Sequence, residues 1–140
     1  MKDRSFLDTN ILVYSFLPSE GSKHNTCKNL LNSLISTEVC ISTQVLNELY
    51  VALKKNGISD VDARYYVEYC ISKYNVFPIG LNEVQACLEL RDRYAFSYWD
   101  SLILAAAIEN DCAVIYSEDM KSDQIINSNF KIINPLLSGE

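Results

Sequence analysis

The feature that most constrains the fold is a set of short apolar runs separated by longer stretches with helical periodicity. Phe6-Leu7, Val39-Cys40-Ile41 and Ala113-Val114-Ile115-Tyr116 are such runs, and residues that cap or turn follow each of them. Strands that are apolar throughout are buried on both faces, which is typical of parallel strands covered by helices. The pattern predicts a doubly wound α/β domain with three layers and a central parallel sheet of four to five strands.

The stretches between these runs predict helices. Apolar residues recur in them at intervals of three and four, and most of the stretches begin at a residue that can cap a helix. The expected helices run from Ser22 to Ser36, from a cap at Ser42 or Thr43 to Asn56, from Ser59 to Lys73, from a cap at Asn82 to Tyr94 and from a cap at Ser97 to Asn110. Two further strands are expected, at Val76 to Ile79 and at Lys131 to Ile133. Pro78 indicates that the first of these lies at a sheet edge.

Length and composition predict one globular domain that spans residues 1–140. Of these 140 residues, 49% are hydrophobic and 21% are charged, with few glycines and prolines, which is the profile of a chain with a single sizeable core. The longest apolar run, Leu102 to Ile108, is far too short to cross a bilayer, and Asp3 and Asp8 interrupt any leader-like apolar region. We therefore expect a soluble, cytoplasmic protein without a membrane partner.

Cysteine and histidine usage restricts the chemistry. The five cysteines form no Cys-x-x-Cys pair, and several have apolar neighbours, so we expect reduced core residues. The one histidine, His24, lies in a polar stretch, so a histidine-based metal site or a Ser-His-Asp triad would depend on a single exposed ring. Any bound metal must therefore be held mainly by oxygen ligands.

Four acids are predicted to meet at one edge of the sheet. Asp8 and Asp119 each follow an apolar strand, and Glu48 lies on the second turn of the helix that leaves the strand ending at Ile41. Asp100 is the only charged residue between Arg93 and Glu109. Ligands of doubly wound sheets bind outside the carboxyl ends of the strands, where the strand order reverses.

Each acid also has an ordinary structural interpretation. Asp8 can cap the following helical turn, and Asp100 can complement a helix dipole in the first turn. Asp119 can be a turn acid, and by composition Glu118 or Asp123 would serve as well. These interpretations do not explain why four acids are expected at the same edge.

A divalent cation would resolve the repulsion among these acids. Carboxylates that lie close together raise one another's pKa values and destabilise a fold unless a cation sits among them. Hard oxygen ligands point to Mg²⁺, with Mn²⁺ as an alternative, and such sites commonly act on phosphate esters. We hypothesise that Asp8, Asp100 and Asp119 bind one or two Mg²⁺ ions, with Glu48 as a further ligand or as the group that positions the attacking water.

The net charge of −6 bears on the substrate. It argues against binding nucleic acid through bulk positive potential, but acids gathered in one cleft account for part of it. An ordinary solvated face is the simpler explanation for each basic residue taken singly, although some could contact a phosphate backbone: Lys54, Lys55, Arg91, Arg93 and Lys121.

Four segments of the chain together resemble the PIN-domain ribonucleases, and among these the small VapC-type toxins of VapBC toxin–antitoxin pairs. The segments occur in the family order and span nearly the whole chain. They are Phe6-Leu7-Asp8-Thr9-Asn10-Ile11-Leu12-Val13-Tyr14, Val45-Leu46-Asn47-Glu48-Leu49, Tyr98-Trp99-Asp100-Ser101-Leu102-Ile103-Leu104-Ala105-Ala106-Ala107 and Tyr116-Ser117-Glu118-Asp119-Met120.

The resemblance implies a PIN-like α/β/α domain and a Mg²⁺-dependent endoribonuclease that hydrolyses RNA phosphodiester bonds, the toxin of a type II module. The family's acids carry over to Asp8, Glu48, Asp100 and Asp119, with Asn10 and Ser117 as polar supports of the site. The resemblance also implies a homodimer and an antitoxin partner. Asp123 departs from relatives that have a small or neutral residue there. The aromatic segment Tyr65-Tyr66-Val67-Glu68-Tyr69 could bind an antitoxin or a second copy of the chain.

Three other functions fit the same fold class. A haloacid-dehalogenase-like phosphatase would use Asp8 as nucleophile, but Asn10 stands where its second acid is expected. A receiver-like signalling domain would need paired acids after the first strand and a lysine after a late strand. A catalytically silent PIN-like domain that only binds a protein partner would keep all four acids.

Overall fold

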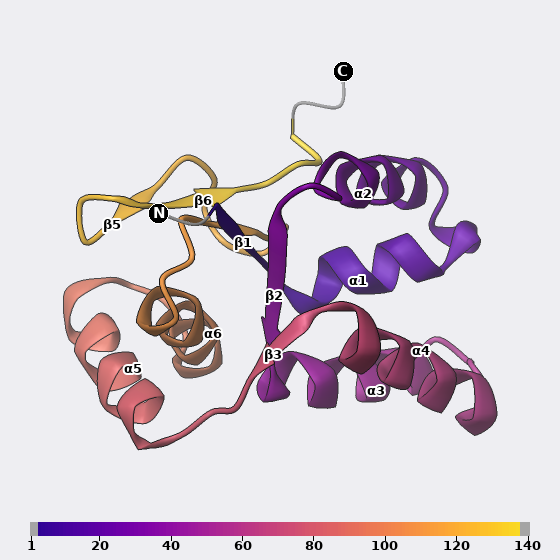
Figure 1. Ribbon diagram of the computed structural model, residues 1–140, viewed down its shortest axis with the longest axis horizontal. Helices are drawn as coiled ribbons and strands as arrows, with labels where there is room; N and C mark the ends of the chain where they lie inside the picture. The colour runs from indigo at the N-terminus through magenta and orange to yellow at the C-terminus, as the bar shows by residue number, and fades with distance from the viewer. Residues whose placement is uncertain (1–2, 138–140) are drawn as a thin grey trace.

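A six-stranded sheet runs through the centre of the molecule (Figure 1), as seen in a computed structural model that describes residues 3–137. The strand order is β3-β2-β1-β4-β6-β5, and all neighbours are parallel except β5 and β6. The strands are β1 (Arg4–Leu7), β2 (Glu38–Ser42), β3 (Asn75–Phe77), β4 (Val114–Tyr116), β5 (Ile125–Ile126) and β6 (Phe130–Ile133).

Helices cover both sides of this sheet. Figure 1 shows α1 to α4 on one side and α5 with α6 on the other, which confirms the expected three-layer α/β/α architecture. The helices are α1 (Thr9–Phe16), α2 (Ser22–Ser33), α3 (Thr43–Lys55), α4 (Asp60–Lys73), α5 (Leu81–Arg93) and α6 (Tyr98–Glu109), with a 3-10 turn η1 (Pro18–Glu20) between α1 and α2.

The strand order reverses between β1 and β4. The chain adds β2 and β3 on one side of β1, then crosses the opposite face through α5 and α6 to form β4 on the other side. In register, Phe6 of β1 lies between Cys40 of β2 and Ile115 of β4. The carboxyl ends of β1 and β4 therefore form the topological switch point, where α/β sheets bind ligands.

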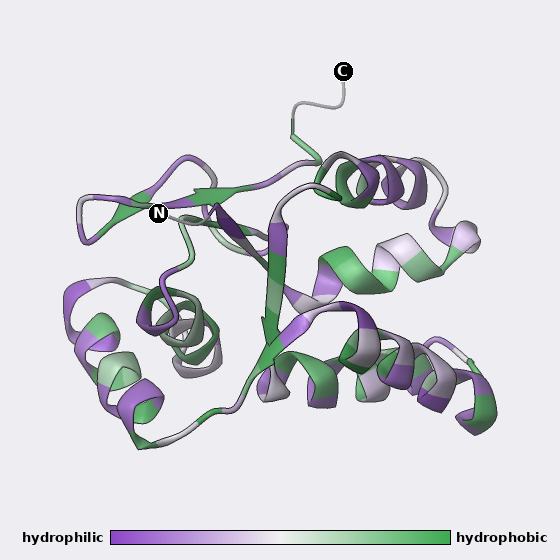
Figure 2. Ribbon diagram, in the orientation of Figure 1, coloured by the Kyte–Doolittle hydropathy of each residue, from purple (hydrophilic) through white to green (hydrophobic). Residues whose placement is uncertain are grey.

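The core is apolar on both faces of the sheet. In Figure 2, hydrophobic residues concentrate on the strands and on the helix faces that meet them. The segment Leu102 to Ala107 of α6 is buried throughout, which explains why this helix has no polar stripe. All five cysteines are buried and free, as expected. None of the helices within residues 3–137 is both long and apolar enough to span a membrane.

Several predicted boundaries were wrong. The sheet has six strands and not four to five, because the two-residue β5 is too short to show a period. Helix α2 ends at Ser33 and not at Ser36, and Ile35 beyond it is 81% exposed. Gly80, not Asn82, caps α5, and the Glu83 carboxylate accepts the Gly80 N–H at 2.8 Å.

The strand expected from Val76 to Ile79 is β3. It begins one residue earlier, at Asn75, and ends two residues earlier, at Phe77. It stops at Phe77 because Pro78 has no N–H to continue the ladder. The sheet edge that Pro78 indicated is confirmed, since β3 is the terminal strand next to β2.

Candidate functional site

A pocket of about 380 Å³ lies at the switch point, and the four acids predicted from the sequence line it, each from a different segment of the chain. Asp8 comes from the end of β1, Glu48 from α3, Asp100 from α6 and Asp119 from the loop after β4. The structure therefore brings together the four acids that the sequence singled out. Thr9, Asn10, Tyr14 and Glu20 also line this acid pocket, together with Val13, Ala52 and Asn56.

Asp8 is the most deeply placed of the four. Its side chain is only 4% exposed and caps α1, and one carboxylate oxygen accepts the Thr9 N–H at 2.7 Å. The other oxygen accepts a hydrogen bond from the Ser117 hydroxyl at 2.7 Å. Burial raises the pKa of Asp8 to about 7; the two hydrogen bonds oppose this rise, and the charges of Asp100 and Glu48 add to it. Asp8 therefore both caps α1 and lines the acid pocket.

Glu48 is held from two sides. The Thr9 hydroxyl donates to one carboxylate oxygen at 2.7 Å, and the Gln44 amide donates to the other at 3.0 Å. The same Gln44 nitrogen also donates to the Trp99 carbonyl oxygen at 3.0 Å, in the first turn of α6. The orientation of Glu48 is therefore fixed relative to the helices that carry Asp8 and Asp100.

Asp100 is half-buried in the first turn of α6. The Ser97 hydroxyl caps this helix by accepting the Asp100 N–H at 3.1 Å. The pKa of Asp100 is raised, first by burial and next by the charge of Asp119, with a smaller effect of Glu48. A helix-dipole role explains its place in the first turn, but its raised pKa shows that the neighbouring acids act on it as well.

Asp119 is the exposed member of the set. The Asn10 side-chain amide donates to its carboxylate at 2.9 Å, while the Asn10 carbonyl oxygen accepts the Glu118 N–H at 3.2 Å. Asn10 therefore joins the start of α1 to the loop after β4. The two residues expected as polar supports, Asn10 and Ser117, each contact one of the four acids.

Glu118 and Asp123, which composition alone made equal candidates, are used elsewhere. The Glu118 carboxylate lies 2.8 Å from the Lys23 ammonium and accepts a hydrogen bond from the Tyr14 hydroxyl. Asp123 lies in a left-handed turn, 3.8 Å from the Lys131 ammonium. Neither Glu118 nor Asp123 is among the described residues that line the acid pocket.

Polar residues in or next to the pocket were missed in the sequence, among them Thr9 and Glu20 in its lining and Gln44 beside Glu48. Gln44 precedes Glu48 by four residues, so helical spacing alone could have placed the two side chains on one face. Thr9 follows Asp8 directly, but its contact with Glu48 joins distant parts of the chain. Glu20 lies in the turn η1, and no sequence pattern links that turn to the acids.

The lining of the acid pocket is rich in oxygen ligands, which are the type that a hard divalent cation binds. Carboxylates are the ligands that Mg²⁺ and Mn²⁺ prefer, and the pKa values of Asp8 and Asp100 are raised by burial and by the neighbouring acids. Within residues 3–137, no three Asp, Glu, His or Cys side chains form a group that could hold a metal ion as they stand. The donor chemistry therefore fits a cation, while the present positions do not form a closed coordination shell.

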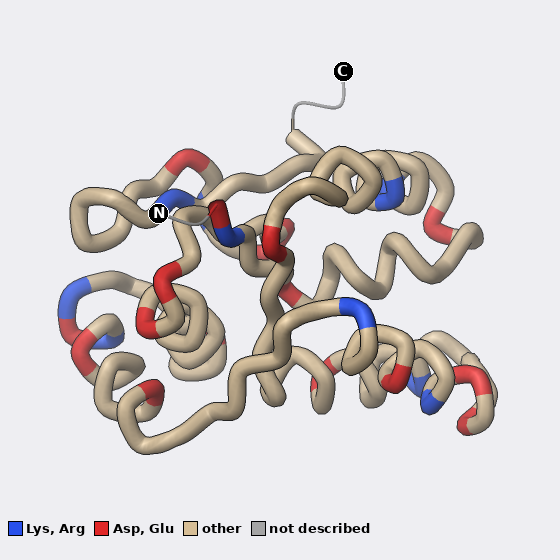
Figure 3. Tube along the Cα trace, viewed as in Figure 1, with Lys and Arg blue, Asp and Glu red and all other residues tan. Residues whose placement is uncertain are grey.

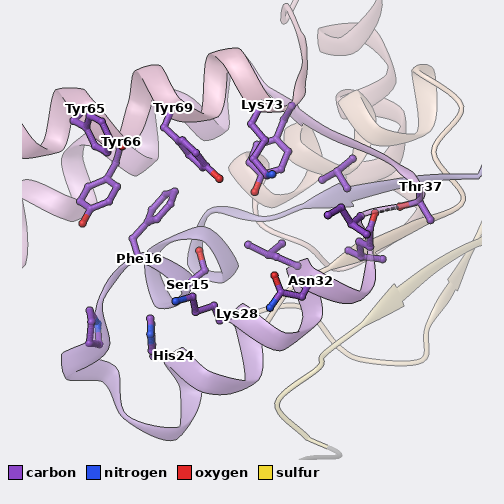
Figure 4. Close-up of a pocket in the computed structure, with 16 residues that line it drawn as sticks. Ser15, Phe16, His24, Lys28, Asn32, Thr37, Tyr65, Tyr66, Tyr69 and Lys73 are labelled. Carbon is purple, nitrogen blue, oxygen red and sulfur yellow. Dashed lines mark hydrogen bonds between the residues drawn. The ribbon is translucent and has the colours of Figure 1, made fainter.

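A second and larger pocket, about 480 Å³, lies between α2 and α4 (Figure 4) and is called the aromatic groove below. Phe16 stacks on Tyr66 with ring centroids 4.5 Å apart, and Tyr69 meets Phe16 edge-on. Lys28 and Lys73 also line this groove. His24, expected to be exposed, is half-buried here, and its Nδ1 is 2.9 Å from the Tyr14 carbonyl oxygen.

Lysine and arginine residues are scattered over the molecule and do not gather in one patch (Figure 3). The five that the sequence suggested as phosphate contacts are all exposed: Lys54, Lys55, Arg91, Arg93 and Lys121. Their distribution does not mark a path for RNA.

Several solved structures with a similar fold come from toxin–antitoxin pairs. A toxin–antitoxin complex from Klebsiella pneumoniae has a TM-score of 0.71 and 23% identity, covering 94% of this chain and 97% of that chain. VapBC2 from Rickettsia felis, bound to a promoter DNA fragment, has a TM-score of 0.69 and 20% identity, covering 94% and 99%. VapC20 from Mycobacterium tuberculosis, a sarcin-ricin loop cleaving toxin, has a TM-score of 0.67 and 18% identity, covering 79% and 86%.

At these identities the structural matches establish a shared fold. No curated protein matches this chain in sequence. The family model of the PIN domain matches residues 5–126, a range that contains all four acids predicted from the sequence. On this match, the chain belongs to the PIN domain family.

Proposed function

We propose that this protein is a metal-dependent endoribonuclease that hydrolyses RNA phosphodiester bonds. The observation that carries the proposal is the convergence of Asp8, Glu48, Asp100 and Asp119 in one open pocket at the switch point of the sheet. Membership of the PIN domain family supports it, as does the fold shared with a sarcin-ricin loop cleaving toxin.

Asp8, Asp100 and Asp119 would hold one or two Mg²⁺ ions, and Mn²⁺ could replace them. Glu48 would be a further ligand or would position the attacking water. A divalent cation bound among these acids would lower the pKa of a water molecule and neutralise charge on the phosphate. The pocket is open to solvent along Asp119, which is exposed, so a polymer could reach it.

The protein's own residues prepare this pocket. Ser117 and Thr9 donate to the two oxygens of Asp8, so its carboxylate keeps one orientation. Thr9 and Gln44 do the same for Glu48. Such hydrogen bonds to ligating groups commonly influence metal affinity by about 10- to 100-fold.

Cleavage of total RNA with and without added Mg²⁺ tests the proposal. The wild-type protein should produce fragments only with the metal, and Asp8→Asn and Asp100→Asn should each lose nearly all activity. Asp92→Asn is the matched control, because Asp92 is an exposed acid of α5 outside the pocket. Wild-type rates in both pocket variants would refute the assignment.

The same assay separates the alternatives. A catalytically silent PIN-like domain would bind Mg²⁺ or a partner without yielding RNA fragments. A haloacid-dehalogenase-like phosphatase is not favoured, because Asn10, where a second acid would be needed, instead donates to Asp119. A phosphatase would release phosphate from small esters and leave internal RNA bonds intact.

We further propose that the chain is the toxin of a type II toxin–antitoxin module and acts in the cytoplasm. The structural neighbours are toxin–antitoxin complexes, and the aromatic groove is suited to a protein partner. Tyr65 and Ile35 line this groove and are 65% and 81% exposed. Its two lysines, Lys28 and Lys73 (Figure 4), would favour an acidic partner segment. We propose that the antitoxin occupies this groove.

Co-expression with the product of a neighbouring reading frame tests the partner. Ile35→Ser and Tyr65→Ser should weaken the complex and release ribonuclease activity. Leu88→Ser is the control, because Leu88 is 53% exposed on α5, across the sheet from the groove. If the control variant weakens the complex equally, the antitoxin binds elsewhere on the protein.

We also propose that the chain forms a homodimer. Light scattering of the protein without its partner tests this proposal through the mass in solution.

A further inference from the structure

We infer that Gln44 is a positioning residue: it fixes Glu48 in the acid pocket and ties it to the helix that carries Asp100. The inference rests on the proposed function and concerns a residue outside the four acids. It starts from the two hydrogen bonds that the Gln44 amide nitrogen donates, to the Glu48 carboxylate and to the Trp99 carbonyl oxygen, each at 3.0 Å.

The orientation of the Gln44 amide is determined by its partners. Both neighbours of the nitrogen are acceptors, a carboxylate and a backbone carbonyl, and neither can donate a hydrogen. Rotating the amide by half a turn would place its oxygen against these two oxygens, which is repulsive. Gln44 is therefore held as a double donor.

Stability alone does not account for a glutamine at this place. Gln44 is only 8% exposed. Within the described part of the chain, its carbonyl oxygen is one of two buried side-chain nitrogen or oxygen atoms that have no hydrogen-bond partner. An unpaired buried oxygen destabilises a fold, whereas Leu or Met would fill the same space without it. The arrangement is explained if the amide serves Glu48.

The consequence is a chain of contacts across the acid pocket. Thr9, next to Asp8, holds one oxygen of Glu48, and Gln44 holds the other. Gln44 in turn holds the carbonyl of Trp99, the residue before Asp100. Glu48 is thereby set in position relative to both Asp8 and Asp100, and loss of Gln44 would leave one of its oxygens without a donor.

Titration calorimetry with Mn²⁺ tests the inference without relying on activity. Gln44→Met keeps the size of the side chain and removes both donors, and we expect it to weaken Mn²⁺ binding by about 10- to 100-fold. Gln85→Met is the matched control, since Gln85 is exposed on α5. If Gln44→Met fails to fold, Gln44→Asn keeps the amide on a shorter side chain and should also weaken binding.

A double-mutant cycle with Glu48→Gln separates positioning from a general effect on the fold. If Gln44 acts through Glu48, Gln44→Met should cause little further loss of Mn²⁺ affinity in the Glu48→Gln background. Unchanged affinity in Gln44→Met, or equal losses in both backgrounds, would overturn the inference alone. A wild-type protein that binds no Mn²⁺ would overturn the proposed function, and the inference with it.

Discussion

Asp8 combines burial with an ionisable carboxyl group in the acid pocket. Its carboxyl group is 4% exposed and its pKa is raised to about 7 from an ordinary value near 3.8, chiefly by burial. The folded protein therefore binds this proton more tightly than the unfolded chain does. The stability that the protonated group contributes is complete below about pH 4 and is lost as the pH rises through about 7.

The first prediction concerns pH. Without metal, the free energy of unfolding of the wild type should fall between pH 4 and pH 8, by up to about 4 kcal/mol from Asp8. Asp8→Asn should remove most of this fall, because an amide can accept from Thr9 and donate to Ser117 without a charge. Urea unfolding in EDTA at both pH values measures it, with Asp92→Asn as control. A pH dependence that is the same in Asp8→Asn and Asp92→Asn would contradict the assigned pKa.

The second prediction concerns Ser117, which is fully buried and donates to Asp8. Ser117→Ala removes this donor, so it should raise the pKa of Asp8 further and lower the free energy of unfolding at pH 8 by about 1–3 kcal/mol. Urea unfolding at pH 8 measures the loss. Ser72→Ala, which removes an exposed hydroxyl on α4, should cost much less. Equal losses would show that the hydroxyl does not support the buried carboxylate.

The sequence predicted which acids would meet and named two of their supports, Asn10 and Ser117, but it did not predict the contacts that hold Glu48. Asp8 and Asp119 could be located because each follows an apolar strand, and strand ends share one edge of a parallel sheet. The contacts of Thr9 with Glu48 and of Gln44 with Trp99 join residues 39 and 55 positions apart. They depend on tertiary packing, which periodicity does not encode.

Among the secondary elements, α6 was the clearest in sequence and β5 was absent from the prediction. Helix α6 has a serine cap and a long apolar run, so both propensity and burial indicate the same element. The two residues of β5 show no alternation, and only pairing with β6 makes them a strand. The beginning of α5 was misplaced because Asn82 was expected to cap the helix. The cap is instead Gly80, whose N–H donates a hydrogen bond to the Glu83 carboxylate.

The third prediction belongs to α6. Ser97→Ala removes the cap that accepts the Asp100 N–H and should lower the free energy of unfolding by about 1 kcal/mol. Ser59→Ala removes the corresponding cap of α4, which accepts the Asp62 N–H, and should cost a similar amount. Only Ser97→Ala should also weaken Mn²⁺ binding in calorimetry, because α6 carries the pocket acid Asp100 and α4 carries none of the pocket acids. Equal metal binding by both variants would contradict a link between this cap and the site.

The molecule as a whole brings together acids that repel one another. The three layers place the ends of β1 and β4 beside the second turn of α3 and the first turn of α6, and the net charge of −6 adds to the field there. Lysine and arginine are spread elsewhere (Figure 3). The fold therefore maintains a negative pocket that a divalent cation would stabilise.

The fourth prediction is that Mg²⁺ stabilises the folded protein. At pH 8, Mg²⁺ at about 100 times its dissociation constant should raise the free energy of unfolding by about 2.7 kcal/mol. Thermal unfolding with MgCl₂, compared with NaCl of equal ionic strength, measures the effect. Asp100→Asn should reduce it and Asp92→Asn should not. Stabilisation by NaCl to the same extent would indicate general screening of charge and not a bound ion.

The most direct test of the central claim is the rate of RNA cleavage by Asp8→Asn, Asp100→Asn and the double variant. If the acids form one catalytic unit, each single variant should lose about 10³-fold or more, and the double variant should be hardly slower than the slower single one. Single losses that multiply in the double variant, or rates near wild type in either single variant, would contradict a shared site.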